Sequence, residues 1–132
     1  MKNCLYCYLP LDDNEKDFHP HCSKKFFGTE NIPEIDFGLD EIDNLALKIL
    51  GRSVALTGVQ PKLSVELSKE KKGKNRLTIV CLWGNYILKP PFVRFPEMTE
   101  IEDLTMHLSD LMGIKTAEHS LIRLKSGELA YI

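Results

Sequence analysis

Thr57-Gly58-Val59-Gln60-Pro61-Lys62-Leu63-Ser64-Val65-Glu66-Leu67 is the stretch of this chain that decides its fold. Its second half alternates, so that Leu63, Val65 and Leu67 fall on one side of an extended strand and polar residues on the other. Gly58 precedes the strand and lets the backbone turn sharply, which can bring main-chain amides close to a ligand. A single glycine before a strand usually only makes a turn. By itself this segment therefore predicts a strand entered through a tight loop.

A second segment indicates a chemical role for the first one. It reads Trp83-Gly84-Asn85-Tyr86-Ile87-Leu88-Lys89-Pro90-Pro91. Tyr86 to Leu88 form a short apolar strand, and Lys89 follows it directly before two prolines. The side chain of a lysine in that position either extends into solvent or pairs with an anion. A loop of backbone amides and an inward lysine are the two parts that hold nucleotide phosphates. Together the two segments indicate a nucleotide-phosphate site.

Length and composition limit the classes of protein to consider. With 132 residues the chain is one domain or a fragment of one. A net charge of −2 and the lack of a large basic field argue against direct binding of nucleic acid. The N-terminus does not resemble a signal peptide, and no apolar run is long enough to span a membrane. We therefore expect a cytoplasmic protein with no membrane partner, whose four cysteines are thiols or metal ligands.

The N-terminal cysteines and histidines are spaced like the ligands of a metal ion. Cys4 and Cys7 are followed after eleven residues by His19 and Cys22, so each pair has a two-residue gap. This pattern predicts a tetrahedral zinc site, which would be structural because four protein ligands leave no open position. His21 competes with His19 as the fourth ligand, although it is adjacent to Cys22. The alternative is a reduced thiol cluster without metal.

The rest of the chain predicts an α+β fold with three parts. Residues 1–28 form a zinc-ribbon-like module, residues 29–52 a linker and a first helix (39–50), and residues 53–132 a sheet and a second helix. The expected strands, in one antiparallel sheet with helices packed against it, lie at 53–56, 62–67, 77–82, 85–89, 119–124 and 128–132.

The second helix, expected over 97–112, carries a candidate partner for Lys89. The candidates on this helix are Glu102 and Glu100, either of which can pair with the ammonium group of Lys89. The alternative for Glu102 is a capping box that begins at Thr99. We expect His107 to face solvent. The apolar face of this helix is expected to consist of Ile101, Leu104, Leu108, Leu111 and Met112.

Several segments resemble the HipA-like serine/threonine kinase toxins of bacterial type II toxin–antitoxin modules. The matching segments are 55–64, 77–80, 83–90, 100–108 and 127–132. The resemblance implies a kinase-like N-terminal lobe that binds ATP with Mg²⁺. The residues implied for ATP binding are Thr57, Gly58, Val59, Gln60, Lys89 and Glu102.

The same resemblance bears on modification and on the metal. Related kinases often carry a phosphorylatable serine where this chain has Ala55, which leaves Thr57 and, with less support, Ser53 as candidates for autophosphorylation. Kinases of this kind often begin with a similar Cys-x-x-Cys and His-Pro-x-Cys arrangement, which supports the zinc prediction.

Phosphoryl transfer also needs carboxylates that orient the hydroxyl and hold Mg²⁺, and none follows the predicted sheet. We therefore expect an ATP-binding lobe that is inactive without a C-terminal kinase lobe, whether it is a fragment or a natural stand-alone lobe. The implied partners are that lobe, a DNA-binding antitoxin and a protein substrate such as an aminoacyl-tRNA synthetase. The alternative function is a small zinc-dependent module that binds protein or nucleic acid and has no enzymatic activity.

Overall fold

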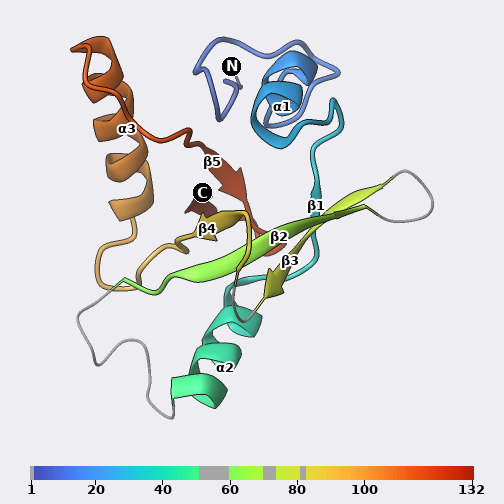
Figure 1. Cartoon of the computed structure of the whole chain (residues 1–132), viewed down its shortest axis with the longest axis vertical. Helices are drawn as coiled ribbons and strands as arrows, with labels where there is room; N and C mark the ends of the chain where they lie inside the picture. The colour runs from blue at the N-terminus through green and yellow to red at the C-terminus, as the bar shows by residue number, and fades with distance from the viewer. Residues whose placement is uncertain (1, 51–59, 70–73, 81–82) are drawn as a thin grey trace.

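The computed structural model describes residues 2–50, 60–69, 74–80 and 83–132, and Figure 1 shows their arrangement. The loop residues Thr57, Gly58 and Val59, the candidate Ser53 with its strand 53–56, and Cys81 lie outside the described residues. The described helices are α1 (Pro20–Phe27), α2 (Leu39–Leu50) and α3 (Met98–Leu111). The described strands are β1 (Glu34–Ile35), β2 (Leu63–Lys69), β3 (Asn75–Val80), β4 (Tyr86–Leu88), β5 (Leu121–Arg123) and β6 (Leu129–Tyr131).

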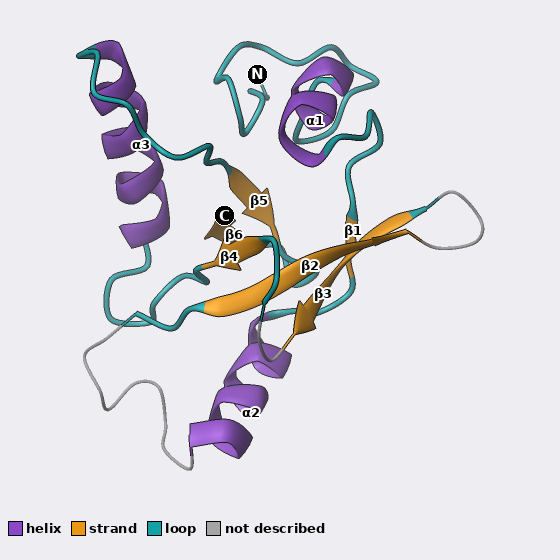
Figure 2. Cartoon of the chain, viewed as in Figure 1, coloured by secondary structure: helices purple, strands orange, loops and turns teal. Residues whose placement is uncertain are grey.

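The strands form a four-stranded sheet in the order β1-β3-β2-β4 and a separate two-stranded ladder, β5-β6. The long β2–β3 hairpin crosses the centre of Figure 2, with α2 below it and α1 and α3 above it in this view. Strand β2 is antiparallel to β3 and to β4. The predicted α+β class is thus confirmed, and the predicted helix over 39–50 has the same bounds in the structure.

The strands differ from the expected single antiparallel sheet in two respects. Glu34 and Ile35, in the predicted linker, pair with β3 in parallel, and two residues are too few to show a period in the sequence. Among the described residues, the β5–β6 ladder is bridged to the end of β4 by the backbones of Lys89 and Tyr131, which exchange hydrogen bonds of 2.7 and 2.9 Å. Pro90 has no N–H to continue this ladder, so the pairing stops there.

Strand β2 has the predicted alternation. Val65 is fully buried, Glu66 is exposed, and Leu63 and Leu67 pack against the core. Gly84 lies so close to this strand that a Cβ atom on it would be 2.4 Å from the carbonyl oxygen of Val65. The Gly84 amide donates to Ser64 Oγ at 2.8 Å, which fixes the approach to β4. Glycine is therefore required by packing at this position.

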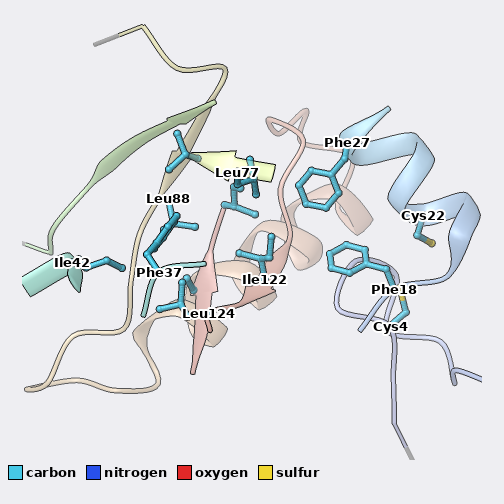
Figure 3. Packing of buried hydrophobic residues seen from close by; sticks show 13 residues of the cluster. Cys4, Phe18, Cys22, Phe27, Phe37, Ile42, Leu77, Leu88, Ile122 and Leu124 are labelled. Carbon is cyan, nitrogen blue, oxygen red and sulfur yellow. The ribbon is translucent and has the colours of Figure 1, made fainter. Parts of the chain in front are cut away.

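The hydrophobic core is continuous from the N-terminal residues to the sheet. Figure 3 shows the rings of Phe18 and Phe27 between the two cysteines Cys4 and Cys22 and the side chain of Ile122. The helix that carries Phe27 begins with Pro20 at its first position and ends at Gly28, whose φ of 75° is easy only for glycine. The three-part division of the chain remains a prediction, but its first and last parts share one core.

Helix α3 buries the side opposite to the one that the sequence predicts. The expected apolar face is on the surface, with exposed fractions from 49% at Leu104 to 84% at Leu111. The buried side carries Thr99 and Asp103, and the helix lies against β5 and β6. The prediction was wrong because burial here follows polar contacts to the N-terminal residues, which apolar periodicity does not reveal. Among the described helices, none has the length and apolar character needed to cross a bilayer.

Candidate functional site

The predicted metal ligands come together at the start of the chain. Cys4, Cys7, His19 and Cys22, which we call the cysteine cluster, each direct one ligand atom to a common point, and these atoms lie within 4.8 Å of one another. A tight turn brings the first two together, since the amide of Tyr8 donates to the carbonyl of Cys4 at 2.9 Å. The other two are brought together by the first turn of α1.

The distances in the cysteine cluster suit a tetrahedral ion. The Nδ1 atom of His19 lies 3.4 Å from Cys7 Sγ and 3.7 Å from Cys22 Sγ. Zinc bonds of about 2.0–2.3 Å separate tetrahedral ligand atoms by roughly 3.3–3.8 Å. The other ring nitrogen, Nε2 of His19, donates to the carbonyl of Pro10 at 3.0 Å, which directs Nδ1 inward as metal-bound histidines require.

Burial and hydrogen bonding act in opposite directions on the two buried thiols. Burial raises the pKa of Cys4, but hydrogen bonds from the amides of Cys7, His19 and Tyr6 outweigh it and leave that pKa lowered. Burial, with the neighbouring Cys7 and Cys4, raises the pKa of Cys22 to about 12. Without a cation the cluster therefore does not hold all its sulfurs as thiolates. A bound divalent cation would stabilise the thiolate form of these sulfurs. The cluster is therefore compatible with zinc.

The structure distinguishes the two candidate histidines. His19 belongs to the cysteine cluster, whereas His21 is exposed and stacks on His19 with ring centres 5.1 Å apart. Its Nε2 atom lies 3.3 Å from Cys22 Sγ, a distance at which a ring N–H donates to a thiolate. His21 thus supports a ligand, and His19 is the better fourth ligand.

Lys89 and Glu102 form an ion pair between the end of β4 and α3. Their side chains are 20% and 28% exposed, so the pair is largely enclosed. The capping-box alternative does not hold, because α3 begins at Met98 and Thr99 lies inside the helix. Thr99 donates to the carboxylate of Glu100 at 2.6 Å, so Glu100 is occupied elsewhere. The role of the Lys89–Glu102 pair in nucleotide binding stays a prediction.

The surroundings of Lys89 hold it firmly. Its backbone bonds to Tyr131 in both directions, and its ammonium nitrogen lies 5.1 Å from the centre of the Tyr131 ring. A cavity of about 380 Å³ lies beside it, lined among others by Tyr86, Ala117 and Ile132. The contribution of Tyr131 was missed because nothing in the sequence links a tyrosine at the end of the chain to Lys89.

Gln60 is the one predicted loop residue that the structure describes. Its Nε2 atom donates to the carbonyl of Pro90 at 3.4 Å, so the end of the loop lies next to the segment that carries Lys89. This contact brings two segments of the predicted site together. The assignment of Gln60 to ATP binding remains a prediction.

The prediction that His107 faces solvent is wrong. Its side chain is 26% exposed, stacks on the ring of Tyr8, and bonds to the carbonyl of Tyr6 at 3.0 Å. Asp103 and His119 lie against it, and the sequence analysis missed both. The four-residue spacing of Asp103 and His107 on a helix was a usable signal. For His119 the sequence offers none.

Comparison with known proteins gives one distant relationship. No family model matches the sequence. The chain is similar to a protein of Haemophilus influenzae described as "Putative kinase", with 27% identity over 129 residues, which cover 92% of this chain and 35% of that protein. The chain thus spans about a third of the length of the curated relative that it matches. The similarity extends over nearly all of this chain and points to a kinase-like relationship.

Proposed function

We propose that this chain is the ATP-binding lobe of a HipA-like protein serine/threonine kinase. The observation that carries the proposal is the ion pair between Lys89, at the end of an apolar strand, and Glu102 on a helix. Kinases use such a pair to align the lysine that contacts the nucleotide phosphates. The similarity to a protein described as a putative kinase supports the same class of function.

The rigidity of Lys89 supports this role. Strand β4 presents the residue, Tyr131 pairs with its backbone on both sides, and the buried Pro90 fixes the exit of the chain. A largely enclosed ammonium group needs a partner, because an unpaired buried charge is costly. Glu102 is that partner without nucleotide, and ATP phosphates would share the lysine when they bind. A stiff element of this kind is what phosphate positioning requires.

The nucleotide would lie near the cavity beside Lys89, which at about 380 Å³ is within the usual size of small-molecule sites. In the proposal, the loop with Thr57, Gly58 and Val59 covers the phosphates, and Gln60 anchors its end. Phosphate on Thr57 or Ser53 would place negative charge near the ATP phosphates and would repel nucleotide.

A catalytic lobe is part of the proposal, because Mg²⁺ and the substrate hydroxyl need carboxylates that follow the ATP-binding lobe in kinases. The exposed apolar side of α3, with Leu104, Leu108 and Leu111, is a surface on which such a lobe could pack. By resemblance, the intact kinase would phosphorylate a protein such as an aminoacyl-tRNA synthetase and would be held by a DNA-binding antitoxin.

The test is Lys89→Met in the intact kinase, meaning this chain joined to its catalytic lobe. The substitution keeps most of the side-chain volume and removes the charge. We expect phosphate transfer from labelled ATP to fall at least about 100-fold, as when one electrostatic contact of a transition state is removed. The matched control is Lys125→Met in the exposed β5–β6 turn, which should leave the rate unchanged. Normal phosphate transfer by a folded Lys89→Met protein would show that the nucleotide site is misplaced.

A further inference from the structure

A second group of metal-binding side chains lies outside the cysteine cluster and outside the Lys89–Glu102 pair. Asp103, His107 and His119, which we call the histidine cluster, direct one ligand atom each to a common point, with these atoms within 4.8 Å of one another. Asp103 and His107 are four residues apart on α3 and therefore share one side of the helix. His119 comes from the segment that leads into β5.

Each histidine of the cluster has one ring nitrogen that contacts a backbone carbonyl outside the cluster. His107 Nε2 lies 3.0 Å from the carbonyl oxygen of Tyr6, and His119 Nδ1 lies 2.9 Å from that of Ala117. A carbonyl accepts only, so both of these nitrogens carry the proton. Metal-bound histidines are held in this way, because the donated N–H fixes the tautomer and directs the other nitrogen to the ion.

The two remaining nitrogens face each other. His107 Nδ1 and His119 Nε2 are 3.0 Å apart, and in the neutral rings each presents a lone pair. The carbonyl oxygen of Asp103 lies 3.0 Å from His107 Nδ1, and carboxylate Oδ2 of the same residue lies 3.5 Å from it. Three acceptor atoms thus lie within 3.5 Å of His107 Nδ1, and only a cation, either a proton on that nitrogen or a metal ion between these groups, makes the arrangement favourable.

The carboxylate of Asp103 distinguishes between these two cations. The residue is fully buried, and Oδ2 accepts a hydrogen bond from the hydroxyl of Tyr8. The other oxygen, Oδ1, is buried without a hydrogen-bond partner among the described residues. A proton between the two rings would leave Oδ1 unpaired, and a buried polar atom without a partner is costly. A metal ion bound by both carboxylate oxygens would pair Oδ1 and engage both rings together.

The backbone of Tyr8 is strained where it supports this group. Its φ of 62° is unusual for a bulky residue, and its ring stacks on His107 with centres 4.5 Å apart. Strained backbone persists where surrounding contacts over-determine it, and such positions concentrate at functional sites. This backbone also makes the turn of the cysteine cluster, so only the side-chain contacts of Tyr8 with Asp103 and His107 connect it to the histidine cluster.

We propose that the histidine cluster binds a second divalent transition-metal ion, of which zinc is the best match. Two imidazole nitrogens and one carboxylate suit zinc and disfavour Mg²⁺, which prefers oxygen ligands. Zinc bonds of about 2.0–2.2 Å separate tetrahedral ligand atoms by roughly 3.3–3.6 Å. The 3.5 Å between His107 Nδ1 and Asp103 Oδ2 agrees with this, and the two ring nitrogens, 3.0 Å apart, would move apart by about 0.3 Å when the ion binds.

The cysteine cluster and the histidine cluster differ in whether a coordination position on the metal stays open. Three protein ligands leave a fourth position open. Both histidines line a cavity of about 370 Å³, which also has Lys25, Lys115, Asp110 and Glu118 in its wall. That position takes water or an anionic group. The ion also joins α3 to the N-terminal residues, because Tyr6 and Tyr8 hold its ligands in place.

Metal analysis of the whole chain, purified in zinc and freed of loose ions, tests the proposal. We expect about two zinc ions per wild-type chain and about one in Asp103→Asn and in His119→Gln. The matched control is Asp110→Asn, an exposed carboxylate of the same helix and cavity, which should keep both ions. Circular dichroism checks that each variant is folded. About one ion in the wild type, unchanged in the two ligand variants, would overturn the proposal.

A cobalt titration of the wild type gives a readout that depends on no variant. Co²⁺ in the cysteine cluster has thiolate-to-metal charge-transfer absorption, whereas Co²⁺ in the histidine cluster has only weaker ligand-field bands. We expect a second equivalent that adds ligand-field absorption without further charge transfer, and no competition from Mg²⁺. Saturation of every band after the first equivalent would mean that a shared proton holds the two histidines, and the metal proposal would be wrong.

Discussion

The cysteine cluster and the histidine cluster share only histidine among their ligands, and they are built in two different ways. All ligands of the cysteine cluster lie in one short N-terminal segment, closed by a turn and by the start of α1. The histidine cluster takes two ligands from α3 and one from the approach to β5, and its supporting groups come from the N-terminal residues Tyr6 and Tyr8. The first can form as soon as its own segment folds, whereas the second exists only after three parts of the chain have met.

This difference indicates what each cluster stabilises. With a metal bound, the cysteine cluster would tie together a short N-terminal segment, as in small zinc domains. The histidine cluster holds parts that already have a shared core, of which Phe18, Phe27 and Ile122 are members. Loss of the cysteine cluster should therefore lower the free energy of unfolding more than loss of the histidine cluster. Substitutions in and around the two clusters can test that order.

Cys22→Ser should have the largest effect. Structural zinc contributes roughly 10–16 kcal/mol in small zinc peptides, so losing one ligand should lower the free energy of unfolding by more than about 4 kcal/mol. Chemical denaturation with parallel metal analysis measures this. His21→Gln removes a neighbouring contact without removing a ligand and should keep the metal. If His21→Gln lost as much metal as Cys22→Ser, His21 and not His19 would be the fourth ligand of the site.

Asp103→Asn should have an intermediate effect. It removes the buried charge that faces His107 and accepts from Tyr8, and breaking a buried pair typically costs about 3 kcal/mol. The decrease should appear in denaturation curves at neutral pH, with metal retained in the cysteine cluster. A decrease as large as that of Cys22→Ser would remove the distinction between the two clusters.

Tyr8→Phe isolates one supporting contact of the histidine cluster. The ring and its stacking on His107 remain, and only the hydroxyl that donates to Asp103 is lost. A hydrogen bond to a charged group is worth about 1.5–2 kcal/mol, and we expect that decrease in the free energy of unfolding. An unchanged stability would mean that the strained backbone of Tyr8 owes nothing to this bond.

Leu108→Ser should have the smallest effect in this chain. Leu108 lies on the exposed apolar side of α3 and is half exposed, so its replacement should change stability by no more than about 0.5 kcal/mol. Substitutions on the polar side of α3, at Asp103, would then lower the stability, whereas substitutions on its apolar side would not. A loss above 2 kcal/mol, measured by the same denaturation, would mean that Leu108 is covered in solution.

The sequence by itself determined the features that depend on neighbours along the chain. The alternation of β2, the bounds of α2 and the pairing of Cys4 with Cys7 all follow from local spacing. The end of α1 at Gly28 follows from the one residue type that adopts its φ without strain. The ion pair of Lys89 and Glu102 was also anticipated, although through resemblance to a kinase family and not through spacing.

Only the tertiary structure decided which side of α3 is buried and what surrounds His107. Hydrophobic periodicity assumes that an apolar stripe faces the core, but α3 buries Thr99 and Asp103, whose polar atoms find partners in Leu129 and Tyr8. These partners are distant in sequence, and the contacts form only when β6 and the N-terminal residues pack against the helix. Local spacing carries no information about such pairs, because side chains far apart in the chain are brought together by the common core.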